Sequence, residues 1–476
     1  MKKGTITIYL AFIFTIILSL LLMIITAARD SAIRFKAECS MDAAIYSVFA
    51  EYNRELLERY DLLFIDSSYG GGQGKIANTE AHLLSYMNKN FDILGSSNIG
   101  SVKDLLQLNA TGSFLLEYRL ASDQGGKVLE RQACDYIKQK YGTNSVALIK
   151  DLCQTAKDSG YFTEDVEAKA SANQAEINSI ELPKKQISDE QWEEIPLENP
   201  ADGVNGTKSI GVLGMVLDPD KELSGTHINA SNYISNRNCN VGIGLKANEQ
   251  SQINTLLFDK YIMEKSNCYT SKENDGLLKY QTEYIIAGND NDPDNLKAVI
   301  EKLLFVREAA NLQYLISDGA KMAEAEALAA SLAAVSAQPL LLEPVKWSIV
   351  LAWTYAESMY DVSHLLAGGK IPLLKDAITW HYSLSAMLHF QSELTSEVSD
   401  TEQGLKYEDY LSIFLVMTSQ DAKCKRMMDI IEMDVRQSEG NRQFRLDSCV
   451  DYLMACVTVE SRFGYGCEIT RDYKYF

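Results

Sequence analysis

The sequence predicts an α+β protein that is mostly helical and begins with one long helix. Three observations support that fold class. The N-terminus contains a long uncharged stretch, apolar side chains then recur at spacings of three and four, and the C-terminal end alternates apolar and polar side chains. Spacings of three and four are typical of helices, whereas a period of two is typical of strands. We therefore expect a helical protein with a small antiparallel sheet that includes a C-terminal hairpin.

The N-terminal stretch is expected to cross a membrane. Lys2 and Lys3 precede an uncharged run from Thr5 to Ala28. A secretory leader has about 7 to 15 apolar residues in its core, whereas a spanning helix needs about 20. An uncleaved anchor is therefore favoured, and the small residues just before Arg29 leave a cleaved leader as the alternative. Because the charges after the span nearly cancel, we expect a cytoplasmic N-terminus and an extracellular bulk.

A helical stalk is expected directly after the membrane stretch. Its apolar positions are Ile33, Ala37, Met41, Ala44, Val48, Tyr52 and Leu56. Neither proline nor glycine interrupts residues 5–66, so the pattern predicts one continuous helix of about 55 residues, on the order of 80 Å long. Residues 29–66 would form its projecting part. Two helices that meet near Arg29 are the alternative.

Composition divides the remaining chain into three regions. Residues 67–180 begin at a glycine-rich loop, and strand-like runs with a helix over Val128–Ala175 predict a first extracellular α+β region. Residues 181–240 are acidic and rich in proline and asparagine, which is typical of a linker. Residues 241–476 form the second extracellular region, which is helical and ends in the hairpin.

Helices dominate the second extracellular region. A strand is expected around Tyr284, and Asp292-Pro293-Asp294 then predicts a helix with proline in its first turn. Three helices are expected over residues 296–317, 320–337 and 344–366. The last contains the run WSIVLAWTYA, which is too short to cross a bilayer and therefore indicates a buried helix.

The C-terminal hairpin is predicted by alternation on both sides of Gly464. The apolar positions are Val450, Tyr452, Met454 and Cys456 in the first strand, and Tyr465, Cys467, Ile469, Tyr473 and Tyr475 in the second. Polar residues occupy the positions between them, which is the pattern of half-buried strands. We expect the hairpin to join a sheet with an earlier strand near Leu105 or Tyr284.

Charge and cysteine usage exclude some classes of partner and cofactor. The formal net charge is -20, so nucleic acid is not expected as a partner. The nine cysteines include no C-x-x-C pair, which speaks against a zinc or redox dithiol site. Most are expected to be buried free thiols. Disulfides between Cys239 and Cys268, or between two of the three C-terminal cysteines, remain open.

One cluster of residues could hold a metal ion. Glu357, Asp361 and His364 are spaced i, i+4 and i+7 and would share one face of a helix. Two carboxylates and an imidazole could bind zinc or manganese. A helix face that is solvated or hydrogen-bonded to its neighbours explains the same spacing and is the favoured interpretation. With no catalytic motif in the chain, we expect a protein that is not an enzyme and needs no cofactor.

The opening KKGTITIYLAF resembles the N-terminus of pilin-like (TadE/TadG-like) proteins of the tight-adherence (Tad or Flp) pilus system. The resemblance implies a helix that is first a membrane anchor and later the packing core of a filament. It also implies processing after Gly4, which would make Thr5 the new N-terminus. Pilins usually carry glutamate five residues after that glycine, and Tyr9 occupies this position here.

A wider resemblance covers most of the chain. The stretches RYDLLFID, LLKYQTEYIIAG, LAWTYAESMYDVSHLLAGGKIPLLK and YEDYLSIFL are similar to an uncharacterised family of Gram-positive bacterial membrane proteins. Some of its members are encoded with Tad pilus genes. The resemblance implies a membrane-anchored architecture and supplies no catalytic residue.

Two hypotheses for the function follow. The first is a pilin-like structural or assembly component of a Tad/Flp-type pilus or related secretion machine. Its partners would be the lipid bilayer, through Thr5, Tyr9 and Ala28 of the anchor, and other membrane proteins of that machine. The second is a membrane-anchored ectodomain that binds a ligand or acts as a metal-dependent hydrolase through Glu357 and its neighbours.

Overall fold

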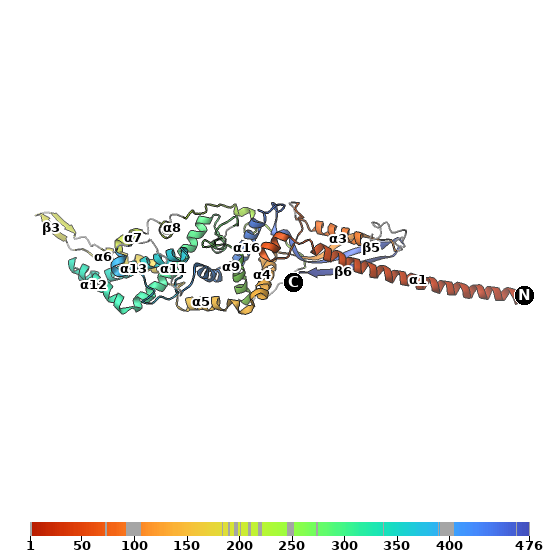
Figure 1. Ribbon diagram of the computed structural model, residues 1–476, viewed down its shortest axis with the longest axis horizontal. Helices are drawn as coiled ribbons and strands as arrows, with labels where there is room; N and C mark the ends of the chain where they lie inside the picture. The colour runs from red at the N-terminus through yellow and green to blue at the C-terminus, as the bar shows by residue number, and fades with distance from the viewer. Residues whose placement is uncertain are drawn as a thin grey trace. The chain divides into compact units, whose positions relative to one another are not determined.

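The computed structural model of the protein describes residues 2–71, 74–91, 106–182, 184–188, 191–194, 199, 201–207, 211–217, 221–244, 252–272, 275–336, 338–388, 390, 404–462 and 464–475. The chain forms two compact units (Figure 1). The first, here the sheet unit, comprises Met1–Tyr136, Ser231–Gln250 and Ile431–Phe476. The second, here the helical unit, comprises Ile137–Ala230 and Ser251–Ile430. The units cut across the regions assigned from composition, because the C-terminal segment returns to the N-terminal one.

The sheet unit contains a four-stranded antiparallel sheet. Its strands are β1 (Ile65–Asp66), β2 (Leu108–Leu120), β5 (Cys449–Ser461) and β6 (Gly466–Lys474). β5 lies at the centre and pairs with all three others, and its Leu453 lies opposite Tyr118 of β2 and Tyr473 of β6. The C-terminal hairpin is therefore confirmed, with Gly464 at positive φ between its strands. The expected earlier strand near position 105 is β2.

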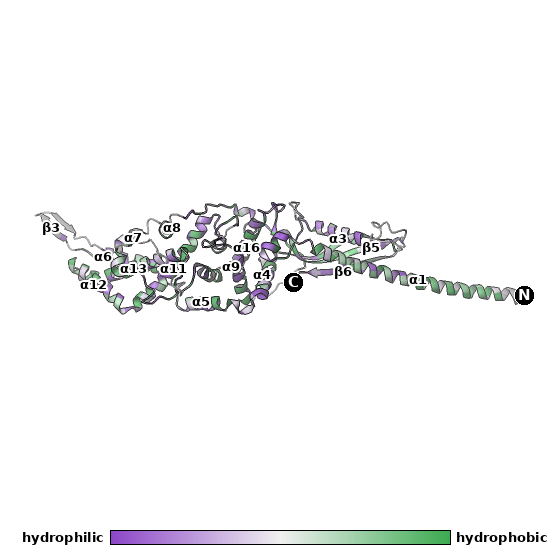
Figure 2. Ribbon diagram, in the orientation of Figure 1, coloured by the Kyte–Doolittle hydropathy of each residue, from purple (hydrophilic) through white to green (hydrophobic). Residues whose placement is uncertain are grey.

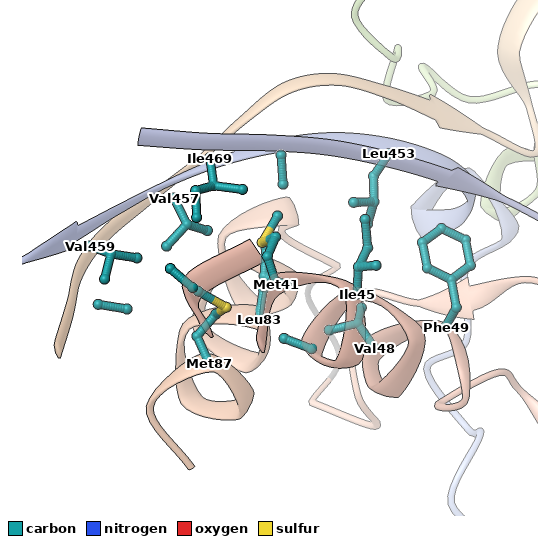
Figure 3. Packing of buried hydrophobic residues seen from close by; sticks show 14 of the residues in the cluster. Met41, Ile45, Val48, Phe49, Leu83, Met87, Leu453, Val457, Val459 and Ile469 are labelled. Carbon is teal, nitrogen blue, oxygen red and sulfur yellow. The ribbon is translucent and has the colours of Figure 1, made fainter. Parts of the chain in front are cut away.

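Two helices cover one face of this sheet. They are α1 (Lys2–Phe49) and α3 (Ile76–Phe91). Figure 3 shows Met41 and Ile45 of α1 and Met87 of α3 pointing toward Leu453 and Val457 of the sheet. The predicted stripe is confirmed in α1, whose fully buried positions include Ile33, Ala37, Met41, Ala44 and Val48.

The first helix is shorter than the sequence predicts. It ends at Phe49 rather than near position 66, and a separate helix α2 (Arg54–Tyr60) follows. Asn53 caps α2 by accepting a hydrogen bond from the Leu56 N–H, and Asp61 ends it in the left-handed conformation. Asparagine and aspartate favour caps and left-handed turns. The chain therefore breaks its helix without proline or glycine.

The core-facing side of β5 also differs from the prediction. The buried positions are Leu453, Ala455, Val457 and Val459, whereas Tyr452, Met454 and Cys456 are half-buried. Both sets are apolar, so residue type alone does not distinguish the two faces of this central strand. In β6 the predicted face is confirmed, because Ile469 is buried and its apolar neighbours pack against the same core.

The helical unit is built around α13 (Leu342–Leu366), which packs against α6 (Val166–Ser179), α11 (Asp292–Ser317) and α12 (Gly319–Val335). The three helices predicted over 296–317, 320–337 and 344–366 are confirmed. α11 begins with Pro293 in its first turn, and the Asn291 side chain caps it. The WSIVLAWTYA stretch lies in α13, which is buried over almost its whole length.

The shorter elements complete this unit. They are α5 (Ala147–Asp158), the hairpin β3 (Lys184–Ser188) and β4 (Gln191–Glu194), α7 (Ala201–Thr207), α8 (Val212–Val216), α9 (Gln252–Lys265), α10 (Gln281–Ala287), α14 (Leu384–Met387) and α15 (Tyr407–Met417). Two of the points at which the chain passes between the units lie within α4 (Asp123–Tyr141) and α16 (Gln420–Val435).

Two secondary-structure predictions are corrected in the helical unit. Tyr284 lies in helix α10 and not in a strand, because a short run of buried apolar residues suits either structure until Gly288 ends it in a left-handed turn. The helix predicted over Val128–Ala175 is interrupted at Gly142 and Gly160, which both have positive φ.

The predicted linker at 181–240 contains ordered structure. Its start forms the β3–β4 hairpin, and Pro183, Pro196 and Pro200 lie outside the described residues. Its end is anchored in the sheet unit by Arg237. The guanidinium donates hydrogen bonds to both oxygens of Glu432, at 2.7 and 2.5 Å, and to Asp447 at 2.6 Å.

All nine cysteines are free thiols, so neither of the disulfide pairings left open by the sequence forms. The prediction that most are buried holds for Cys134, Cys153, Cys268, Cys424 and Cys449. Cys39, on α1, is exposed.

A matched pair of leucine variants tests the packing of the sheet. Leu453 is 1% exposed on β5, and Leu116 is 47% exposed on β2. We expect Leu453→Ala to lower the free energy of unfolding by about 2–5 kcal/mol because it leaves a cavity. Leu116→Ala should change it by less than about 1 kcal/mol. Denaturant unfolding measures both variants, and equal losses would contradict the assignment of faces.

Candidate functional site

The N-terminal half of α1 is an exposed apolar surface. Every residue from Ile6 to Ala28 is exposed, and Figure 2 shows this part of the helix in the hydrophobic colour. The described part of the chain contains one helix long and apolar enough to cross a membrane, and this is it. A signal sequence meets the same criteria. An apolar surface of this size requires a partner other than water.

Two of the hydroxyl groups within this stretch form hydrogen bonds within the helix itself. The hydroxyl of Thr15 donates to the carbonyl of Phe12, and that of Thr26 donates to the carbonyl of Leu22, each at 2.8 Å. A lipid environment offers no hydrogen-bond partners, so internal satisfaction of this kind is a condition for insertion.

The sequence-predicted residues of the anchor all lie along this one helix. Gly4 is exposed, and a Cβ placed on it would meet no other atom within 4 Å. Tyr9, at the position where pilins carry glutamate, is 75% exposed, and Ala28 is exposed at the far end. Thr5 lies in the helix, and its side chain is outside the described part of the structure. The helix spaces these residues out and does not assemble them into a pocket.

The second half of α1 is attached to the C-terminal strand by charge and by aromatic packing. Arg471 of β6 donates to Asp42 at 2.8 Å and lies 3.6 Å from Glu38. The Tyr475 hydroxyl donates to the carbonyl of Phe49 at 2.5 Å, and the rings of these two residues pack edge to face. The exposed apolar half of α1 is therefore continuous with the half that is docked on the sheet.

The predicted metal cluster lies on α13, buried in the helical unit. Glu357 and Asp361 are fully buried, and the ammonium of Lys375 contacts both carboxylates, with 2.5 Å to Asp361 Oδ1. Glu357 also accepts hydrogen bonds from the N–H groups of His381 and Tyr382, at 2.8 Å each. A cation supplied by the chain therefore occupies the space between the two carboxylates.

Arg307 of α11 completes this network. Its guanidinium donates to Asp361 Oδ2 at 3.0 Å, to the Tyr410 hydroxyl at 3.1 Å and to Asn311 Oδ1 at 3.1 Å. It also donates to two backbone carbonyls of the segment that follows α13. Burial alone would raise the pKa of Asp361, but Lys375 and Arg307 outweigh that effect and lower it. The charged groups thus tie α11, α13 and α15 together.

His364 does not join the two carboxylates at a common centre. Its ring packs against Gly369, where a Cβ would lie 2.1 Å from Nε2, and its Nδ1 has no hydrogen-bond partner among the described residues. Burial lowers the pKa of His364. In the described part of the chain, no three His, Cys, Asp or Glu side chains are arranged to hold a metal ion. The buried charges around α13 are therefore explained by pairing within the chain rather than by a metal ion. We call this network of Glu357, Asp361, Lys375 and Arg307 the ionic clamp.

Sequence reasoning missed the partners of this clamp, although a signal for them exists. Arg307 and Lys375 are charged residues within apolar runs, LLFVREAANL and IPLLKDA. A charge in such a setting is buried only when it is paired. Each charged residue within an apolar run therefore predicts a buried partner of opposite charge. Only the fold identifies Asp361 and Glu357 as these partners.

A second buried carboxyl lies in α10. Glu283 is fully buried, and its Oε1 accepts hydrogen bonds from the Tyr269 N–H and the Tyr407 hydroxyl, each at 2.9 Å. Its Oε2 has no hydrogen-bond partner among the described residues. Burial raises the pKa of Glu283 to about 7. The folded protein therefore holds a proton here that the unfolded chain releases at lower pH.

A known protein family matches more than half of the chain, across parts of both units. The DUF5702 profile, described as a family of unknown function, matches residues 190–461. The chain belongs to this family. The DUF5702 match covers more than half of the chain and includes Arg307, Asp361 and Lys375, whereas α1 precedes it. No curated protein and no solved structure matches the chain.

Removal of Lys375 tests the ionic clamp. We expect Lys375→Met to lower the free energy of unfolding by about 3–5 kcal/mol at neutral pH, because it leaves buried carboxylates without their ammonium partner. Part of the loss should be regained as the pH falls and the carboxylates are protonated. Denaturant unfolding at several pH values measures this. The control is Lys425→Met, since Lys425 pairs with Asp421 at the surface, and a similar loss in both variants would contradict the clamp.

The Glu283→Gln variant tests the buried carboxyl. Since the pKa of Glu283 is raised to about 7, ionisation at higher pH opposes folding, and stability is lost as the pH rises from the unfolded-state pKa through 7. We expect Glu283→Gln to be more stable than the parent protein above pH 7, by up to about 3 kcal/mol. Near pH 4 the two should converge. Thermal unfolding across this range measures the difference, and a constant offset would contradict the prediction.

Proposed function

We propose that this chain is a single-span, membrane-anchored and pilin-like component of a Tad/Flp-type pilus or related surface secretion machine of Gram-positive bacteria. Its role is structural or assembly-related and non-enzymatic. One observation carries the proposal: a single uninterrupted helix, α1, exposes an apolar first half and docks its second half on an antiparallel sheet.

The physical logic of that helix supports an assembly role. A helix satisfies its own backbone, so its apolar half is stable in lipid and equally stable among neighbouring apolar helices. The second half is fixed to β5 and β6 by a buried core and by Arg471. Movement of the anchor from lipid into an assembly would therefore carry the folded sheet with it.

The topology and partners follow from the same proposal. Lys2 and Lys3 keep the short N-terminal tail in the cytoplasm, and the bulk of the chain lies outside the cell. The partners are the lipid bilayer and other membrane proteins of the pilus or secretion machine. Gly4 and Thr5 flank the position at which a prepilin peptidase would act. The glutamate missing at Tyr9 favours an assembly component over a major pilin.

The alternative of a metal-dependent hydrolase has no support in the geometry around α13. Lys375 and Arg307 already neutralise Glu357 and Asp361. The ring of His364 packs against Gly369 instead. A non-enzymatic role agrees better with a cluster whose charges are paired within the chain.

An arginine placed in the middle of the anchor tests the membrane role. We expect Ile17→Arg to disfavour insertion by about 2.5–3.5 kcal/mol, so that the protein leaves the membrane fraction. The matched control is Phe35→Arg, since Phe35 also lies on α1 and is 70% exposed but follows the apolar stretch. Fractionation of cells with carbonate-washed membranes measures both variants. Equal retention of the two would contradict the anchor.

The same variants test the assembly role in a strain that lacks the chromosomal copy. The deletion should abolish pilus assembly, adhesion or secretion, and the Phe35→Arg copy should restore the lost activity. The Ile17→Arg copy should not restore it. A deletion strain with unchanged pili, adhesion and secretion would overturn the proposal.

A further inference from the structure

The helical unit contains a cavity of about 710 Å³ that lies away from the ionic clamp of α13. Its walls come from α10, α11, α15, α16 and the segment between α5 and α6. Small-molecule sites have volumes of about 300–1,000 Å³ and are mostly apolar with a few convergent polar groups. The cavity has both the size and the composition of such a site.

Apolar and cationic side chains line this cavity together. Phe162, Phe305 and Phe414 provide aromatic surface, and Lys302 and Arg426 provide two positive charges. Burial lowers the pKa of Lys302, and Arg426 lies close enough to lower it further. In a chain with a formal net charge of -20, two neighbouring cations on an apolar cavity are expected where an anion binds.

The guanidinium of Arg426 is held in a defined position. It donates hydrogen bonds to the carbonyls of Ile285 at 2.8 Å and Ile286 at 3.0 Å, in the last turn of α10. Gly288 permits this approach, because a Cβ there would lie 2.3 Å from the guanidinium. A charge fixed by the backbone before a ligand arrives lowers the entropic cost of binding.

Two carboxylates lie near these cations. Glu301 also lines the cavity, but it lies 3.9 Å from Lys297 in an exposed pair, and Asp429 is buried close to Arg426. Thr418 and Ser419 line the cavity where α16 begins, and the start of a helix adds partial positive charge. The cations, the helix start and the aromatic walls together suit a ligand that is anionic at one end and apolar over the rest.

We propose that this cavity binds a small amphiphile with one carboxylate or phosphate head and an apolar chain. The head lies between Lys302 and Arg426, near the start of α16, and the chain lies along Phe162, Phe305 and Phe414. The site is independent of the membrane role proposed for α1, because every residue that forms it belongs to the helical unit.

Binding of radiolabelled dodecanoate to the full-length protein in zwitterionic lipid nanodiscs tests the proposal, with empty nanodiscs as the blank. We expect saturable binding, and binding weaker by about tenfold or more for Lys302→Gln, since a hydrogen bond to a charged group contributes about 1.5–3 kcal/mol. The matched control is Lys425→Gln, which alters α16 outside the cavity, in an exposed pair with Asp421, and should bind like the parent protein. Unchanged thermal stability of both variants without dodecanoate excludes a folding defect.

Competition identifies the head group and the need for a chain. Displacement by dodecyl phosphate or by anionic phospholipid in the nanodisc would support a phosphate-headed amphiphile, and its absence would support a carboxylate. Dodecanol and inorganic phosphate should both fail to compete, because each supplies only half of the ligand. Binding no greater than to empty nanodiscs, equal binding by Lys302→Gln, or competition by phosphate alone would overturn the proposal. None of these outcomes bears on pilus assembly.

Discussion

Within the described part of the chain, no other element covers the apolar first half of α1, so this surface needs an apolar environment. Residues Ile6 to Ala28 are exposed, and from Ile33 onward the same helix is buried against the sheet. Free energy favours an apolar environment for the first part and the protein core for the second. Because the helix is continuous through the change, the environment of the anchor and the position of the sheet are mechanically linked.

The helical unit is stabilised differently, by charged groups buried in pairs. Arg307 and Lys375 neutralise carboxylates on α13, and Lys423 pairs with Asp259 in the same unit. Such pairs add little stability over apolar packing, but any arrangement that separates them is strongly disfavoured. They therefore select one packing of these helices. The cationic cavity lies elsewhere in the same unit.

Sequence periodicity predicted those elements whose pattern is long and unambiguous. The stripe beginning at Ile33, the helix start at Pro293 and the C-terminal hairpin all follow from it. Periodicity failed at Tyr284, where a short buried run suits a helix and a strand equally, and in β5, where both faces are apolar. The partners of Glu357 could not be predicted, because charge pairing across helices depends on contacts that no local pattern contains.

We propose that α1 remains part of the mature protein, as an anchor that is docked on its own sheet. Mass spectrometry of the N-terminus of the protein from its native membrane tests this most directly. A retained anchor predicts an end at Met1, Lys2 or Thr5, and an end at Thr5 that disappears without the prepilin peptidase would show pilin-type processing. An end near Arg29 would contradict a retained anchor, because the apolar half of α1 would then be a leader that is removed.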